Sequence, residues 1–330
     1  MTLPATFPAF RIHNDNAGYR SGIEEIELDA LSPGEVVIRT AYSSVNFKDA
    51  LAGTGKGKIL RQFPLVGGID VAGHVVQSRD PAFKEGDAVL CTGCGLSETR
   101  DGGYSAYARL ESRWAIRLPA GLDLRESMIL GTAGFTAGLA LLRMQDNRQT
   151  PDLGPLAVTG ATGGVGSLAI AIFSTAGYAV HAISGKADQD DWLRSLGAAE
   201  VLGREALSTT RPMDTARFGG GLDNVGGPML HALLAHTAPY GNVATAGLAA
   251  THDLATTVMP FIIRGVSLLG VASAGTARDL RDEVWHRLSS DWKPARLGDI
   301  ATREVALDGL PAVFADMLAG GSRGRTLVRL

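Results

Sequence analysis

The chain has 330 residues, of which 45% are hydrophobic and 20% are charged, which indicates a globular protein of about two domains. Its formal net charge is −3 and it has no long basic run, so neither nucleic acid nor a membrane is an expected partner. Cys91 and Cys94 are the only cysteines, which argues against a secreted disulfide framework. The N-terminus has no secretory signal pattern, and apolar stretches such as LAIAIF are too short or interrupted to span a bilayer, so we expect a cytoplasmic protein.

The first third of the chain is rich in short apolar runs with β-branched residues. These runs predict strands at 35–45, 70–78 and 87–93, and turn residues between them favour a barrel-like β domain. The pattern changes near Ser127, where the long apolar segment 128–144 predicts a buried helix.

Strand and helix patterns then alternate along the chain. We expect a strand at 156–159, a helix at 165–177, a strand at 178–184, a helix at 188–198, and strand-and-loop units at 199–203, 220–227, 241–249 and 266–273. This alternation is typical of a parallel doubly wound sheet. The tail predicts a strand at 304–307, a helix at 308–320 and a strand at 324–330. We therefore expect an α/β protein with one domain at 1–126, completed by 291–330, and a Rossmann domain at 127–290.

The segment TGATGGVGS lies between a predicted strand and a predicted helix. A side chain in such a turn would block a pyrophosphate, and the N–H groups and positive dipole end of the helix N-terminus attract it. The alternative is a tight turn that binds nothing. The motif predicts a dinucleotide site formed by Gly160, Ala161, Thr162, Gly163, Gly164, Val165 and Gly166.

The end of the second strand of this unit indicates which dinucleotide binds. An NAD site places an acidic residue there for the ribose 2′-hydroxyl, but this chain has Ser184, Gly185 and Lys186, and no carboxylate before Asp188. A hydroxyl, a backbone amide and a cation suit a 2′-phosphate, and Arg204 follows the third strand. We therefore expect NADPH; the alternative for Lys186 is a solvated loop lysine.

Metal ligands are sparse in the sequence. A zinc site needs three or four ligands, whereas the seven histidines are scattered singly and Cys91-Thr-Gly-Cys94 is the only cysteine pair. We expect no metal. The two cysteines are interpreted as packing or turn residues, with a redox pair as the alternative.

The motifs SSVNFKDA, GKGKI, GGYSAYA, GTAGFTAG, TGATGGVGS, LDNVGG and TTVMPFIIRGVSLLG together resemble the acrylyl-CoA reductases, a quinone-oxidoreductase-like branch of the zinc-free medium-chain dehydrogenase/reductase superfamily. The resemblance runs from about Val36 to the C-terminus. It implies a GroES-like β-barrel catalytic domain, a Rossmann domain, NADPH, and a homodimer joined through 266–273. The implied reaction reduces the 2,3 double bond of acrylyl-CoA to propanoyl-CoA.

The same resemblance implies further cofactor contacts within these motifs, at Phe47, Thr136, Gly247, Leu248, Ile262 and Ser273. Three positions depart from the family pattern. Phe47 replaces a tyrosine, Cys94 replaces an aromatic residue, and Gly67 replaces a proline. These departures bear on substrate shape more than on cofactor use.

Hydride addition to an enoyl thioester requires stabilisation of the charge that develops on the carbonyl oxygen. Asn46 is the candidate donor, with Lys48 and Asp49 behind it; alternatively, Asn46 caps a turn while Lys48 and Asp49 form an ion pair. Arg325 is a further candidate for contact with substrate or cofactor, against the alternative of an exposed strand arginine.

The segment GKGKILR contains Lys56, Lys58 and Arg61, which are candidates for binding the phosphates of coenzyme A. A solvated basic loop is the alternative. Two other functions share the cofactor features: an NADPH:quinone oxidoreductase, and a non-catalytic NADPH-binding sensor. Salt-sensitive binding of coenzyme A would exclude the first, and turnover of either substrate would exclude the second.

Overall fold

The computed structural model describes residues 3–330, and the chain divides into two compact units. Unit 1 comprises Met1–Thr132, Ala274–Asp282 and Ala301–Leu330, and unit 2 comprises Ala133–Ser273 and Glu283–Ile300. The domains predicted at 1–126 with 291–330 and at 127–290 stay a prediction, because a compact unit is not by itself an independently folding domain.

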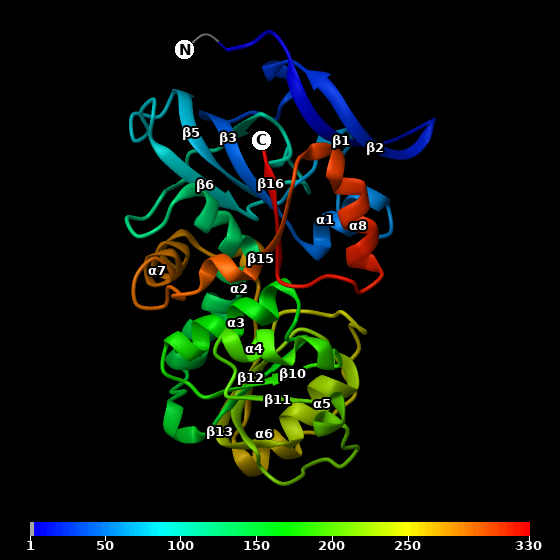
Figure 1. Ribbon diagram of the computed structural model, residues 1–330, viewed down its shortest axis with the longest axis vertical. Helices are drawn as coiled ribbons and strands as arrows, with labels where there is room; N and C mark the ends of the chain where they lie inside the picture. Colours follow the sequence, from blue (N-terminus) through cyan, green and yellow to red (C-terminus); the bar gives the residue numbers. More distant parts are fainter. Residues whose placement is uncertain (1–2) are drawn as a thin grey trace. The chain divides into compact units, whose positions relative to one another are not determined.

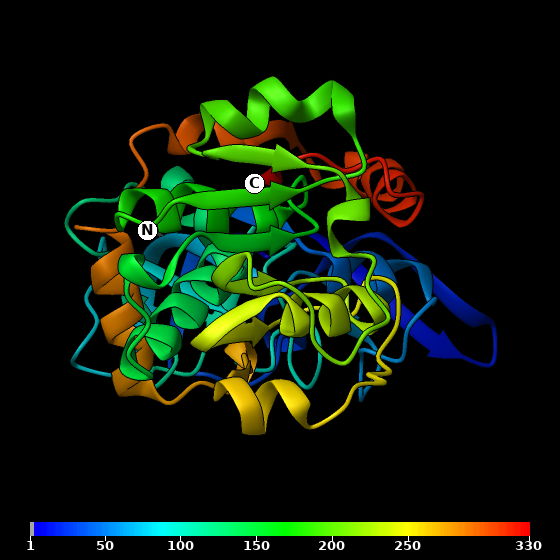
Figure 2. The same cartoon turned by 90° about the horizontal axis from the view of Figure 1, so that it is seen from below.

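Unit 2 contains a six-stranded parallel sheet with the order β11-β10-β9-β12-β13-β14. Its strands are β9 (Leu156–Thr159), β10 (Val180–Ile183), β11 (Glu200–Leu202), β12 (Phe218–Asp223), β13 (Thr237–Thr245) and β14 (Ser267–Gly270). Helices lie on both faces of these strands (Figures 1 and 2). The predicted doubly wound parallel sheet is confirmed. Its order reverses between β9 and β12, which is where such sheets bind ligands.

The helices of unit 2 follow the strands in sequence. They are α3 (Gly164–Thr175), α4 (Asp190–Ser195), α5 (Gly227–Ala235) and α6 (Met259–Arg264), and α7 (Arg278–Leu288) enters the unit at Glu283. The helix predicted at 188–198 is shorter: a 3₁₀ turn at Ala187–Gln189 precedes α4. The other 3₁₀ turns of the chain are Leu28–Ala30, Pro151–Leu153, Arg204–Leu207, Ser273–Gly275, Leu297–Ile300 and Leu307–Gly309.

Unit 1 is built on two sheets. The larger has the order β15-β16-β3-β5-β6-β8, with β7 also pairing with β3, and the smaller has the order β2-β1-β4. The strands are β1 (Phe7–Asp15), β2 (Gly18–Ile26), β3 (Val36–Val45), β4 (Leu65–Val66), β5 (Asp70–Ser78), β6 (Ala88–Thr92), β7 (Tyr107–Leu110), β8 (Ile116–Arg117), β15 (Ala301–Val305) and β16 (Arg325–Arg329). The predicted strands at 35–45, 70–78 and 87–93 correspond to β3, β5 and β6.

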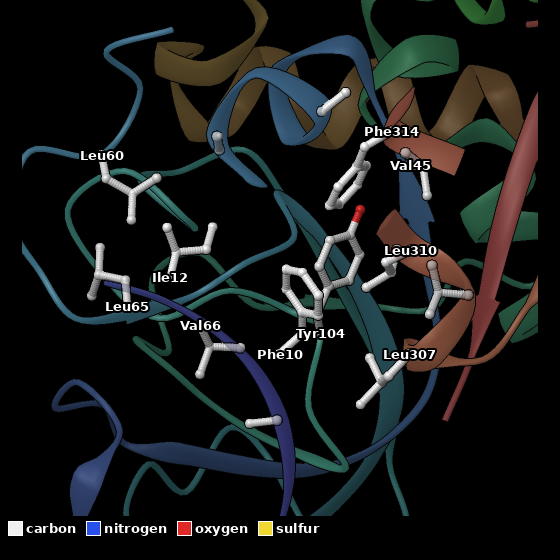
Figure 3. Packing of buried hydrophobic residues seen from close by; sticks show 14 of the residues in the cluster. Phe10, Ile12, Val45, Leu60, Leu65, Val66, Tyr104, Leu307, Leu310 and Phe314 are labelled. Carbon is white, nitrogen blue, oxygen red and sulfur yellow. The ribbon is translucent and has the colours of Figure 1, made fainter. Parts of the chain in front are cut away.

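Two helices pack beside these sheets in unit 1, α1 (Phe47–Thr54) and α8 (Leu310–Leu318). A Cβ atom at Gly53 of α1 would lie 2.3 Å from the ring of Phe314, so the close approach of the two helices requires glycine there. Phe314 lies in the core shown in Figure 3, with its ring centroid 5.9 Å from that of Phe10. This core therefore fixes α1 against the β-structure.

The final strand explains how distant residues meet in unit 1. β16 pairs antiparallel with β3, with Thr326 opposite Val45. Arg325 therefore lies beside the end of β3, where α1 begins at its N-cap, Asn46.

α2 (Leu124–Asp146) is longer than the predicted segment 128–144 and is interrupted at Gly131, whose backbone has φ 49° and ψ −156°. By length and composition α2 is apolar enough to cross a membrane, but 89% of its most apolar window is buried in the protein. This burial is expected of a core helix, in agreement with the predicted buried helix.

Candidate active site and cofactor site

The glycine turn joins β9 to α3 in unit 2. Gly160 has a left-handed φ of 60°, and Gly163 is the N-cap of α3. A Cβ atom at Gly166 would lie 2.3 Å from the carbonyl oxygen of Gly160, so only glycine permits the helix to begin so close to the turn. Of the other motif residues, Ala161 and Thr162 are buried, while Gly164 and Val165 are half-buried. This backbone geometry fits a pyrophosphate at the helix N-terminus.

Two residues of β12 and its following loop support this turn, and the sequence interpretation gave them no role. The Thr159 hydroxyl donates to Asp223 Oδ1 at 2.8 Å, and Asn224 Nδ2 donates to the Thr159 carbonyl at 2.8 Å. Asp223 is fully buried, and this burial raises the pKa of its carboxyl. These contacts connect the carboxyl ends of β9 and β12, on either side of the point where the strand order reverses.

A cavity of about 370 Å³ lies in unit 2 beside the carboxyl ends of β10 and β11. Its lining comprises Ser184, Gly185, Ala187, Asp190, Val201, Leu202, Gly203, Arg204 and Glu205. A Cβ atom at Gly185 would lie 2.6 Å from Arg204 Nε, so glycine allows the guanidinium to lie against the strand end. The predicted phosphate residues Ser184, Gly185 and Arg204 are therefore brought together.

Lys186 is half-buried near this cavity but is not one of its lining residues. Its backbone N–H donates to Ser184 Oγ at 3.0 Å. Arg204 is thus the cation that lines the cavity, together with the acidic Asp190 and Glu205. Both the Lys186 and the Arg204 contacts to cofactor stay predictions.

Unit 1 contains a buried polar network centred on Asp70, at the start of β5. Asp70 Oδ2 accepts hydrogen bonds from Ser44 Oγ at 2.6 Å and Asn46 Nδ2 at 2.7 Å. Its Oδ1 accepts from the Thr132 hydroxyl at 2.6 Å and the Thr132 backbone N–H at 3.0 Å. The carboxylate is fully buried, so these donors replace its water shell.

Arg325 enters the same network from β16 and is 2% exposed, so the alternative of an exposed strand arginine is wrong. Its guanidinium donates to Ser44 Oγ at 2.7 Å, to the Val45 carbonyl at 3.0 Å and to Asn46 Oδ1 at 3.1 Å. Arg325 Nη2 lies 3.6 Å from Asp70 Oδ2. The guanidinium therefore binds both the end of β3 and the N-cap of α1.

Asp49 is the second carboxyl of this network and occupies the third position of α1. It accepts hydrogen bonds from the backbone N–H of Asn46 at 2.8 Å and of Ile69 at 2.9 Å. Burial, and next the charge of Asp70, raise the pKa of Asp49 to about 7. The network thus holds two carboxyl groups against one guanidinium, and it retains a proton near neutral pH.

Both polar atoms of the Asn46 side-chain amide form hydrogen bonds within the network. Nδ2 donates to Asp70 at 2.7 Å and to Asp49 at 3.2 Å, while Oδ1 accepts from Arg325. Asn46 is also the N-cap of α1, as the alternative interpretation held. These contacts place Asn46 as a positioning residue; direct contact with substrate stays a prediction. Lys48 pairs with Glu98, so the alternative of a Lys48–Asp49 ion pair is wrong.

The candidate coenzyme A residues lie in the loop that follows α1. Lys56, Lys58 and Arg61 are all exposed, and between residues 3 and 330 no hydrogen bond or ion pair joins their side chains to another residue. Leu60 precedes Arg61 in the sequence, and its side chain is buried in the core of unit 1, which anchors the loop (Figure 3). The three cations are therefore exposed side chains of one anchored loop.

The cofactor contacts implied only by the resemblance are dispersed. In unit 1, Phe47 is 47% exposed at the start of α1. In unit 2, Thr136 is buried in α2, Gly247 and Leu248 follow β13, Ile262 is 73% exposed on α6, and Ser273 follows β14. A Cβ atom at Gly247 would lie 2.4 Å from the Asn224 carbonyl oxygen. The loop after β13 therefore lies beside Asn224, which donates a hydrogen bond to Thr159 at the glycine turn.

Both cysteines are buried, and neither forms a disulfide. Cys91 lies in β6, one residue before its end, and Cys94 lies in a turn with φ 53°, donating to the Thr92 carbonyl at 3.5 Å. Over residues 3–330, no group of three or more His, Cys, Asp or Glu side chains is arranged to hold a metal ion.

Asp70, Ser44 and Thr132 are network residues that the sequence interpretation missed. The sequence pattern predicts Asp70 only as the start of a strand and Thr132 only as part of a buried apolar helix. A polar residue inside each apolar run was the available signal, because a buried carboxyl needs partners.

The sequence matches the "Alcohol dehydrogenase GroES-like domain" family over residues 32–120 and the "Zinc-binding dehydrogenase" family over residues 164–290. It is 44% identical over 310 residues to the "Putative quinone oxidoreductase YhfP" of Bacillus subtilis, covering 93% of this chain and 94% of that protein. It is 40% identical over 311 residues to the acrylyl-CoA reductase AcuI of Ruegeria pomeroyi, covering 94% of each chain.

Solved structures show the same similarity over the whole chain. The yhdH oxidoreductase of Salmonella enterica, in complex with NADP, has 41% sequence identity and a TM-score of 0.94 over 98% of this chain and 99% of that one. The B. subtilis protein yhfP, with NAD bound, has 41% identity and a TM-score of 0.95 over 99% of this chain and 100% of that one.

Proposed function

Because this chain belongs to the acrylyl-CoA reductase family, within the quinone-oxidoreductase-like medium-chain dehydrogenase/reductases, we propose that it reduces the 2,3 double bond of acrylyl-CoA to propanoyl-CoA with NADPH. The oxidoreductase class follows from the family. The acyl-CoA substrate is supported by the AcuI relative and by one observation on this chain: three exposed cations without acidic partners on an anchored loop after α1.

The cofactor is NADPH, as in the NADP-bound relative. Gly160, Gly163 and Gly166 would receive its pyrophosphate, while Ser184, Gly185 and Arg204 would receive its 2′-phosphate. When bound, NADPH supplies the hydride for the substrate's double bond. Ser184, Gly185 and Lys186, which directly follow β10, include no carboxylate for a ribose 2′-hydroxyl; Asp190 and Glu205 line the same cavity, but they do so together with Arg204, whose charge favours the phosphorylated cofactor.

The protein's own contribution in unit 1 is positioning. The Asp70–Arg325 network fixes the end of β3 to the N-terminus of α1, and so fixes the direction in which this helix leaves the sheet. The helix N-terminus presents a positive dipole end, which stabilises negative charge nearby. Phe47, the first exposed residue of α1, has no hydroxyl, so it cannot donate a proton at this end of the helix.

A triple variant tests the substrate assignment. Lys56→Ala, Lys58→Ala and Arg61→Ala together should raise KM for acrylyl-CoA about tenfold or more and flatten its salt dependence, because each exposed charge contact contributes up to about 1 kcal/mol. KM for a quinone should hardly change. The control is Arg39→Ala, Arg79→Ala and Lys84→Ala, which removes the same charge from exposed positions of unit 1.

A quinone oxidoreductase is the second candidate function, and the name of the B. subtilis relative favours it. A triple variant indistinguishable from wild type, with quinone reduced as efficiently as acrylyl-CoA, would replace the first proposal by this one. A protein that binds NADPH and turns over neither substrate would instead be a sensor. We also propose a homodimer and a cytoplasmic location.

A further inference from the structure

We propose that Tyr19 and Phe63 form the adenine-binding part of a coenzyme A site, beside the cations of the 55–61 loop. This inference rests on the proposed acyl-CoA function and adds to it a second group of residues, from the β1–β2 hairpin and from the chain after the loop.

The two rings form an exposed aromatic pair at the base of the loop. Tyr19 is 37% exposed and Phe63 is 36% exposed, and their ring centroids lie 5.7 Å apart at an interplanar angle of 82°. Gly55, the first residue of the loop, has φ 70°, and a Cβ atom there would lie 2.8 Å from the Tyr19 ring. The ring of Tyr19 therefore packs on the start of the loop, and Phe63 follows its last cation by two residues.

Hydrogen bonds to α1 fix the position of Tyr19, the hairpin member of this pair. The Tyr19 hydroxyl donates to the Ala52 carbonyl, and Ser21 Oγ donates to the Gly53 carbonyl at 2.7 Å. Both acceptors are carbonyls of the last turn of α1, where helix carbonyls lack i→i+4 partners, and the Ala52 carbonyl also accepts the backbone N–H of the C-cap residue Gly55 at 3.3 Å. The hairpin is thus bound to the C-terminal end of α1, and its aromatic side chain is held in place before a ligand arrives.

An uncharged stripe on α1 connects this end of the helix to the buried polar network. Phe47 is exposed, Leu51 is half-buried and Thr54 is exposed; their spacing of four and three residues places them on one face of the helix. Eight helical residues span roughly 12 Å. A long, uncharged pantetheine arm laid along this stripe would connect an acyl group near Asn46 with phosphates near Lys56.

The chemistry of the ligand matches the combination of groups. An adenine ring stacks on aromatic faces whatever its substituents, and base–aromatic stacking contributes to binding in nucleotide sites. The diphosphate and the ribose 3′-phosphate of coenzyme A are anionic, and the loop offers three exposed cations for them. A quinone carries neither an adenine nor a phosphate, so this site would bind only the acyl-CoA class.

Binding of adenosine 3′,5′-bisphosphate to the NADPH-saturated enzyme tests the inference by calorimetry, since saturation occupies the dinucleotide site. We expect wild-type protein to bind it, and Phe63→Leu and Tyr19→Leu each to weaken the affinity at least fivefold. Tyr240→Leu, at a 76% exposed tyrosine of unit 2, is the matched control and should bind as wild type does. Thermal melting shows whether each variant folds. If Tyr19→Leu does not fold, the affinity of Phe63→Leu for the bisphosphate decides the test.

A kinetic comparison completes the test. For each variant, kcat/KM is measured with acrylyl-CoA and with the short acrylyl thioester of N-acetylcysteamine, which lacks the nucleotide. The aromatic variants should lose activity on the first substrate only. No binding of the bisphosphate by wild type, or equal binding by the aromatic variants, would overturn the inference. Aromatic-dependent binding without turnover of acrylyl-CoA would support the nucleotide site while contradicting the proposed function.

Discussion

Gly131 packs against the buried polar network, which leaves no room for a side chain at this position. Its φ of 49° disfavours any side chain, and a Cβ atom there would lie 2.6 Å from Asp70 Oδ2 and 2.8 Å from Ser44 Oγ. We expect Gly131→Ala to lower the free energy of unfolding by about 1–3 kcal/mol or more, because strain and a clash with polar atoms add. Gly22→Ala, in open space on β2, is the control. Equal urea midpoints for the two variants would contradict this description.

Asp49 gives the protein a predictable dependence of stability on pH. The folded protein keeps the Asp49 proton up to about pH 7, whereas an unfolded aspartate loses it near its ordinary value of 3.8. The folded state therefore binds more protons in this window, and the contribution of Asp49 to the free energy of unfolding falls as pH rises from about 4 to 7. Asp49→Asn cannot ionise and should show a flatter profile of urea midpoint against pH. Parallel profiles would show that Asp49 titrates normally.

Arg204 and Lys186 determine the cofactor preference in this account. Arg204→Ala should raise KM for NADPH by tenfold or more and leave KM for NADH nearly unchanged, since one charge-assisted phosphate contact is worth about 1.5–3 kcal/mol. Lys186→Ala should act in the same direction. Arg194→Ala removes an exposed arginine of α4 that does not line the cavity, and it should change neither constant. Equal effects of Arg204→Ala on both cofactors would refute the phosphate assignment.

The helices and strands that were predictable from the sequence are those with a strong local pattern of residues. The unit from β9 to β10 was predictable because glycine spacing and apolar runs define its turn and its buried strands. The hairpin β1–β2 was missed because β2 is mostly exposed and lacks apolar alternation. α1 was missed because eight residues carry little periodicity.

The candidate site was only partly predictable for a related reason. The sequence indicated Asn46, Asp49 and Arg325 one by one. The contact between Arg325 and Asn46 depends on the pairing of β16 with β3, which brings together residues about 280 positions apart in the sequence. No local pattern encodes that pairing. The partners of each side chain, and hence the structural role of the Asn46 amide, were visible only in the fold.

The edge of the parallel sheet carries the predicted dimer contact. β14 is the last strand of the sheet, and α6, the helix that precedes it, leaves Ile262 and Ile263 exposed by 73% and 56%, with its N-cap Val258 exposed by 64%. A bare edge beside apolar side chains is expected to pair with another chain. Ile262→Asp should shift the mass in light scattering from dimer towards monomer. Ile23→Asp, at a 47% exposed isoleucine of unit 1, should remain dimeric. A monomeric wild type at micromolar concentration would refute the dimer.

In the whole molecule, the proposed cofactor site lies in unit 2 and the proposed substrate-positioning network lies in unit 1. The binding energy of a remote nucleotide portion then serves to orient a small acyl group for reduction. A substrate without that portion should lose kcat as well as affinity.

The most direct test compares kcat/KM for acrylyl-CoA, crotonyl-CoA and a simple quinone, side by side, with NADPH and the wild-type protein. We expect acrylyl-CoA to have by far the highest kcat/KM. Equal or higher kcat/KM for the quinone would contradict this expectation.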